Sequence, residues 1–107
     1  MLADDDPLFP VQAFFNAIAA SDFVETLAGL ARGIGQGINV AGCEFPADLD
    51  PGEEPFEGVR CYLFEEEIVV DDHTFAKFVR LACQSHLSEH PQDRDAIDAL
   101  LIERGWA

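Results

Sequence analysis

The chain has 107 residues, of which 21 are acidic and 6 are basic, so its formal net charge is −15. This balance argues against direct binding to nucleic-acid phosphates, which needs clustered lysines and arginines. It does not indicate disorder, because 49% of the residues are hydrophobic and nine are phenylalanines. Length and composition together predict one globular domain with a strongly acidic surface.

The first residues and the cysteines favour a cytoplasmic protein. Residues 1–6 lack the cationic and apolar regions of a secretory signal, and no apolar run approaches the roughly 20 residues that span a bilayer. Cys43, Cys61 and Cys83 form an odd set, which is typical of reduced, buried thiols when no export signal is present. We therefore expect a cytoplasmic location without membrane contact, since anionic lipids also repel an acidic protein.

The N-terminal third predicts two helices. Apolar residues at intervals of three and four predict helices over 10–20 and 22–32, with a break between them. Asp22 and Glu25 have the spacing of a capping box at the start of the second helix. Gly33 directly follows this helix and has the character of a C-cap.

The middle of the chain predicts a small antiparallel sheet. Strands are expected over 38–45, 57–64 and 68–70, because these runs are apolar or alternate between apolar and polar residues. Segment 46–56 is rich in Asp, Glu, Pro and Gly and is expected to be a loop. The glutamates of 65–67 are expected to form the turn of a hairpin, since strands this close together pair antiparallel.

The last third returns to helix and completes the predicted fold. Asp71 and Asp72 are suited to the start of a helix, Pro91 interrupts it, and a final helix is expected over 92–103. We predict an α+β domain with N-terminal helices, an antiparallel sheet of about three strands and two C-terminal helices packed on one face. Residues 1–9 are expected to be a flexible acidic lead, and residues 10–107 a single domain.

Negative charge is concentrated in the middle of the chain. Residues 44–72 hold eleven carboxylates and one arginine, a net charge of −10. Such crowding costs stability through repulsion, so it serves either solubility or the binding of a cationic partner. The second interpretation assigns partner binding to the acids of the 46–56 loop and the following hairpin: Asp48, Asp50, Glu53, Glu54, Glu57, Glu65, Glu66 and Glu67.

No catalytic, metal or cofactor site is predicted. Cys83, His86 and His90 have helical spacing and the right donor atoms for zinc, but a fourth ligand is not evident. The serines lack a nucleophile elbow, and no cysteine has a neighbouring base in the sequence. We therefore expect no enzyme activity, no cofactor and no bound metal.

Several short motifs, in this order and spacing, resemble the immunity proteins of contact-dependent growth inhibition (CDI), specifically the CdiI-type family that neutralises ribonuclease toxins. The motifs are Phe14-Phe15-Asn16, Cys43-Glu44-Phe45-Pro46 with the acidic loop after it, Phe56-Glu57-Gly58-Val59, Glu66-Glu67-Ile68-Val69-Val70, Leu81-Ala82-Cys83 and His90-Pro91-Gln92-Asp93. The resemblance extends from about residue 13 to residue 102.

The resemblance implies a non-enzymatic cytoplasmic antidote. Its partner would be the cognate toxin domain of a CdiA-type effector, a basic ribonuclease delivered by a neighbouring cell, and a monomer is expected. It implies neither nucleic-acid nor membrane binding. The acidic composition leaves two alternatives open: a small secretion chaperone for an effector protein, and an unrecognised enzyme.

Overall fold

The computed structural model describes residues 7–38, 40–46, 51–52 and 56–106; residues 1–6 of the predicted acidic lead 1–9 and most of the 46–56 loop lie outside it. Its elements in chain order are α1 (Phe9–Ala17), α2 (Phe23–Ala31), β1 (Gln36–Ile38), β2 (Ala41–Glu44), β3 (Val59–Leu63), β4 (Glu66–Val70), α3 (Asp72–Glu89) and α4 (Arg94–Arg104). Single 3₁₀ turns precede α2 (Ala20–Asp22) and α4 (Pro91–Asp93). The predicted α+β class is confirmed.

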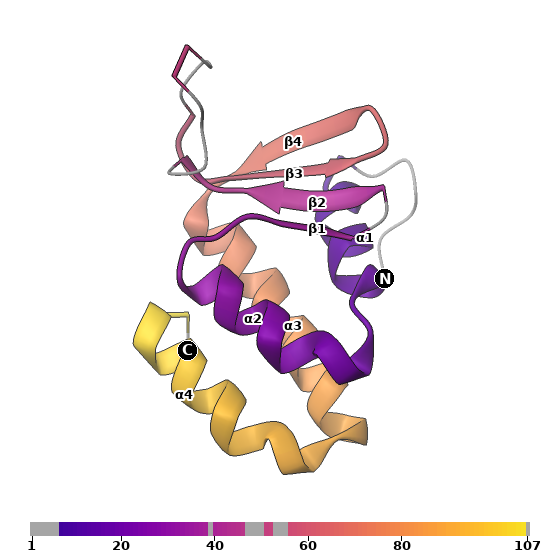
Figure 1. Cartoon of the computed structure of the whole chain (residues 1–107), viewed down its shortest axis with the longest axis vertical. Helices are drawn as coiled ribbons and strands as arrows, with labels where there is room; N and C mark the ends of the chain where they lie inside the picture. Colours follow the sequence, from indigo (N-terminus) through magenta and orange to yellow (C-terminus); the bar gives the residue numbers. More distant parts are fainter. Residues whose placement is uncertain (1–6, 39, 47–50, 53–55, 107) are drawn as a thin grey trace.

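The sheet has four antiparallel strands in the order β1-β2-β3-β4, one more than the sequence predicts (Figure 1). The predicted strand over 38–45 is wrong, because the chain reverses between Ile38 and its cross-strand partner Ala41. Glycines make this close pairing possible: Gly37 lies opposite Gly42, and Tyr62 of β3 lies across both. A β-carbon at Gly42 would overlap the Tyr62 ring.

The β3–β4 hairpin forms as predicted, but its turn lies elsewhere. Leu63 pairs with Glu66, so the turn consists of Phe64 and Glu65 alone, and Glu66 and Glu67 belong to β4. Phe64, which the alternating pattern places at the end of the strand, has a φ of 55°. The alternating sequence pattern includes Phe64, whereas the pairing of β3 with β4 ends one residue earlier, at Leu63.

The helix ends follow local chemistry in most places. The amides of Gly33 and Ile34 donate to the carbonyls of Leu30 and Gly29, which is the Schellman pattern expected of a C-cap glycine. Asp71 caps α3 by accepting a hydrogen bond from the Thr74 amide at 2.7 Å. The predicted capping box at Asp22 is wrong, because Asp22 ends a 3₁₀ turn in a helical conformation and its side chain caps nothing.

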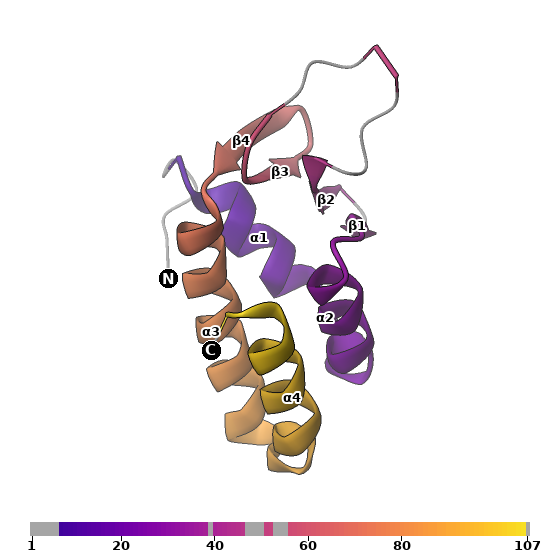
Figure 2. The ribbon, with the colours of Figure 1, turned by 90° about the vertical axis from the view of Figure 1, so that its left-hand side faces the viewer.

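The described helices lie on one side of the sheet (Figures 1 and 2). The sequence predicts the two C-terminal helices on the sheet face; in the structure α1 lies directly against β2 and β3, α3 packs beside α1, and α4 packs against α2. The first helix takes this position because Val11, Phe14 and Phe15 give it an apolar face that is almost fully buried. The opposite sheet face is not covered by any described helix.

Phe75 of α3 is the centre of an aromatic cluster in the core. Its ring centroid lies 5.6 Å from Phe15 of α1, 6.0 Å from Phe45 after β2 and 5.7 Å from Trp106 at the C-terminal end. The chain beyond α4 is held further by Arg80, which donates to the Trp106 carbonyl at 3.0 Å. Aromatic pairs at these separations add to the hydrophobic gain of burial.

We predict that Gly58→Ala destabilises the fold more than the matched substitution Gly105→Ala. Both glycines have positive φ, at 94° and 80°, but a β-carbon at Gly58 would overlap the Val70 carbonyl, whereas the space at Gly105 is open. Backbone strain alone costs about 1–2 kcal/mol, and overlap with main chain adds roughly 1–3 kcal/mol at Gly58. Urea unfolding of the two variants measures the difference; equal losses would contradict the close packing at Gly58.

Candidate functional site

Four of the eight predicted partner-binding residues lie within the described part of the chain. Glu57, Glu65, Glu66 and Glu67 are all exposed. The other four lie outside the described residues: Asp48, Asp50, Glu53 and Glu54.

The β3–β4 hairpin brings three of the glutamates together. Glu65 is in the turn, Glu66 lies opposite Leu63, and Glu67 lies opposite Tyr62. Successive strand residues point to opposite faces, so Glu66 and Glu67 extend to the two sides of the sheet. The tip of the hairpin therefore carries carboxylates in more than one direction.

Glu57 lies at the other end of the hairpin. It precedes β3, whose first residue Val59 pairs with the last residue of β4, Val70. A five-residue strand spans roughly 16 Å, so the structure separates Glu57 from the tip. It instead brings Glu57 to the end of the hairpin where Asp71 and Asp72 begin α3.

The one arginine of the acidic segment is engaged away from the tip. Arg60 Nη2 lies 2.6 Å from Glu44 Oε2, and its guanidinium lies 4.9 Å from the centre of the Phe56 ring. None of the described residues forms an ion pair with Glu65, Glu66 or Glu67. Within the described part of the chain, these exposed glutamates therefore have no cation that neutralises them.

At the base of the hairpin, the charge of Asp71 has a local role. The hydroxyl and the amide of Thr74 both donate to its carboxylate, and these bonds lower the pKa of Asp71. Asp71 thus stabilises the start of α3 in its charged form. The exposed glutamates of the tip have no comparable structural role among the described residues.

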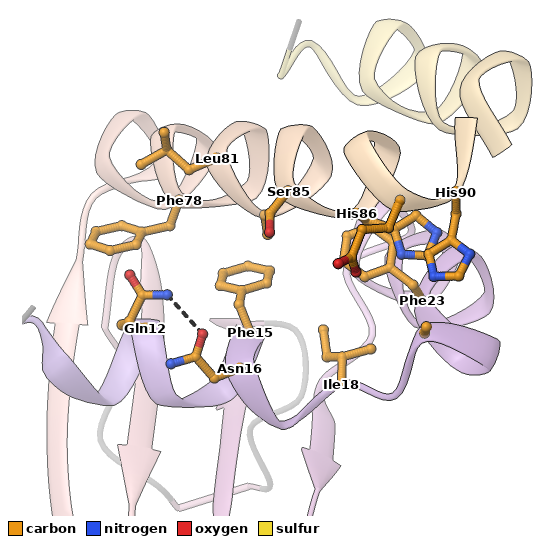
Figure 3. A pocket seen from close by; sticks show the side chains of 13 residues that line it. Gln12, Phe15, Asn16, Ile18, Phe23, Phe78, Leu81, Ser85, His86 and His90 are labelled. Atoms are coloured by element: carbon orange, nitrogen blue, oxygen red, sulfur yellow. Dashed lines mark hydrogen bonds between the residues drawn. The ribbon is translucent and has the colours of Figure 1, made fainter. Parts of the chain in front are cut away.

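A groove of about 490 Å³ lies between α1 and α3 in the helical layer (Figure 3). Apolar and amide side chains line most of it, and Gln12 donates to Asn16 across its edge at 3.0 Å. Ser85 also lines the groove, without a base placed to activate it. The groove is therefore a partly apolar surface, and among the described residues Ser85 has no hydrogen bond to a base.

His86, at one end of this groove, is part of the packing. Its ring stacks between Phe23 at 4.3 Å and His90 at 4.8 Å, and its Nε2 donates to Asp93 at 2.7 Å (Figure 3). Cys83, the third residue of the zinc hypothesis, is buried in the core. Within the described ranges no three His, Cys, Asp or Glu residues are arranged to hold a metal ion.

The three cysteines are free and buried, as the sequence predicts. Cys43 and Cys61 are direct cross-strand partners on the inner face of the sheet. Burial raises the pKa of the Cys61 thiol far above its usual value, and it raises the pKa of Cys83 to about 11. At neutral pH both stay protonated, so neither is an activated nucleophile.

Sequence reasoning missed Phe64 as a surface residue. The predicted strand over 57–64 includes Phe64, yet the residue follows the end of β3 in the turn and is 72% exposed. The short spacing between the two strand-like runs indicates a tight turn near Phe64. The turn lacks the Asn or Gly that normally marks a two-residue hairpin, so its position could not be predicted.

The comparison with known families gives the class of the protein. The model of the CDI immunity protein family matches residues 7–101. The chain therefore belongs to the CDI immunity protein family, which assigns it an immunity role. No curated protein is similar enough to the sequence to count as a relative. None of the helices in the described part has the length and apolar character needed to cross a membrane.

We predict that the native protein resists thiol reagents. The thiolate is the reactive form, and burial both shields the three sulfurs and disfavours their ionisation. Ellman's reagent should therefore react slowly with the folded protein at neutral pH and with all three cysteines after denaturation. Rapid labelling of any cysteine in the folded protein would contradict their structural role.

Proposed function

We propose that this chain neutralises a ribonuclease toxin domain of a CdiA-type effector by covering the basic active-site cleft of the toxin with its acidic surface. The observation that carries the proposal is the hairpin tip, where Glu65, Glu66 and Glu67 are adjacent, exposed and without ion pairs among the described residues. Membership in the CDI immunity family supports a toxin domain as the partner.

The physical basis is complementarity between carboxylates and a phosphate-binding surface. A ribonuclease binds its substrate through cationic side chains, and closely placed carboxylates satisfy the same groups. Charge pairs across one nuclease–inhibitor interface couple by about 1.5–7 kcal/mol. Opposite charge also steers encounter, up to about 10⁸–10⁹ M⁻¹s⁻¹ at low ionic strength.

The geometry of the hairpin favours insertion over flat docking. Because Glu66 and Glu67 extend to opposite faces of β4, a partner that contacts both must surround the strand end. A cleft with two cationic walls meets this condition. The proposed surface also includes Glu57 at the base of the hairpin and the loop acids outside the described residues: Asp48, Asp50, Glu53 and Glu54.

In this proposal the protein occludes the active site of the toxin in the cytoplasm, where the RNA substrate of the toxin is found. It needs no cofactor, and it binds neither membrane nor nucleic acid. It is not an enzyme in this proposal, and it acts as a monomer. A secretion chaperone is not carried further, because the family match assigns an immunity role.

We predict that replacing Glu65, Glu66 and Glu67 with Gln slows association with the cognate toxin domain about tenfold at low salt, because steering is lost. The measurement is stopped-flow association with a catalytically inactive toxin domain over a range of ionic strength. Wild-type association should slow as salt screens the charges. RNA cleavage by the active toxin domain should stop when wild-type protein is added in equal amount.

The matched control removes the same charge from the opposite end of the molecule. Asp95, Asp98 and Glu103 are exposed on α4, and their replacement with Asn, Asn and Gln changes the net charge equally. This control should slow association no more than about twofold. Equal effects of the two triple variants would contradict a local role of the tip, and salt-independent association would contradict steering.

A further inference from the structure

Phe64 occupies a position that neither folding nor turn chemistry explains. It is 72% exposed, so its ring gains little from burial in the free protein. Its φ of 55° lies in the left-handed region, where bulky residues are uncommon and Gly or Asn is preferred. An observed backbone outlier of this kind, with an apolar ring held in water, points to a function at the surface.

Hydrogen bonds on both sides of the turn constrain the backbone at Phe64. The turn holds only two residues between the paired Leu63 and Glu66, and the Phe64 amide donates to the Val40 carbonyl at 2.8 Å. This bond ties the hairpin tip to the connection between β1 and β2. A side chain presented by a fixed backbone loses less entropy on binding than one on a mobile loop.

A hollow lies beside the Phe64 ring. It has a volume of about 620 Å³ and is lined by Phe9, Leu63, Phe64, Glu65 and Glu66. Val40, which accepts the Phe64 hydrogen bond, is itself 45% exposed. The tip therefore combines a projecting aromatic ring, an adjacent apolar recess and carboxylates at the rim.

We propose that Phe64 is the aromatic anchor of the toxin interface, inserting into an apolar pocket bordered by lysine or arginine side chains that pair with Glu65 and Glu66. The inference rests on the proposed function and adds the residue that carries most of the affinity. Charge complementarity favours a cationic partner, because Glu65 and Glu66 have no ion-pair partners among the described residues. A second copy of this chain, with net charge −15, would bring like charges together.

We expect the Phe64 ring and the neighbouring glutamates to affect different rate constants of toxin binding. Aromatic anchors in desolvated pockets dominate binding energy, while surrounding polar residues exclude water. Loss of the ring should therefore speed dissociation, whereas loss of the glutamates slows association. This difference distinguishes an anchor from a residue that only supports the turn.

The test compares Phe64→Asn with Ile102→Asn, which alters an equally exposed apolar residue on α4 (71%). Asn suits the positive φ, so Phe64→Asn should keep or raise the midpoint of thermal unfolding. It should weaken toxin binding by about thirtyfold or more, through faster dissociation, with the salt dependence of association unchanged. Ile102→Asn should bind as wild type does.

The possible failures are distinguishable. If wild type binds and inhibits the toxin domain while Phe64→Asn binds within about threefold of it, the anchor is overturned and the proposed function stands. If wild type neither binds nor inhibits, the proposed function itself fails. A wild-type dimer in sedimentation that Phe64→Asn abolishes would assign the ring to self-association and overturn the anchor.

Discussion

The packing of Phe75 is the interaction on which the rest of the structure depends. One fully buried ring contacts side chains from α1, from the segment after β2 and from the C-terminal end. These segments are far apart in sequence. Because this cluster fixes their relative positions, the sheet is held with one face against the described helices.

The core lies on one side of the sheet, and the side chains at the hairpin tip are not part of it. Val59 and Cys61 of β3 are fully buried, whereas Phe64 and the glutamates that follow project into solvent. Residues at the tip can carry unpaired charge and a backbone conformation that a core position would not tolerate.

Electrostatics divides the acidic segment into two groups with different roles. Asp71 and Glu44 are engaged within the molecule, one with the amide and hydroxyl of Thr74 and the other with Arg60. Glu65, Glu66 and Glu67 have no such partners in the described part of the chain. Composition alone assigns the same charge to all five. The sequence pattern distinguishes Asp71 as a helix cap, and the folded arrangement distinguishes Glu44, which pairs with Arg60, from the three glutamates of the tip.

The sequence by itself determined the α+β class, the β3–β4 hairpin, the Gly33 and Asp71 caps and the burial of the cysteines, because these follow from local periodicity and local hydrogen bonding. Only the tertiary structure decided that 38–45 folds back on itself and that α1 covers the sheet. It alone placed Phe64 in the turn and separated Glu57 from the tip. Strand register and helix packing arise from contacts between distant residues, which no local pattern encodes.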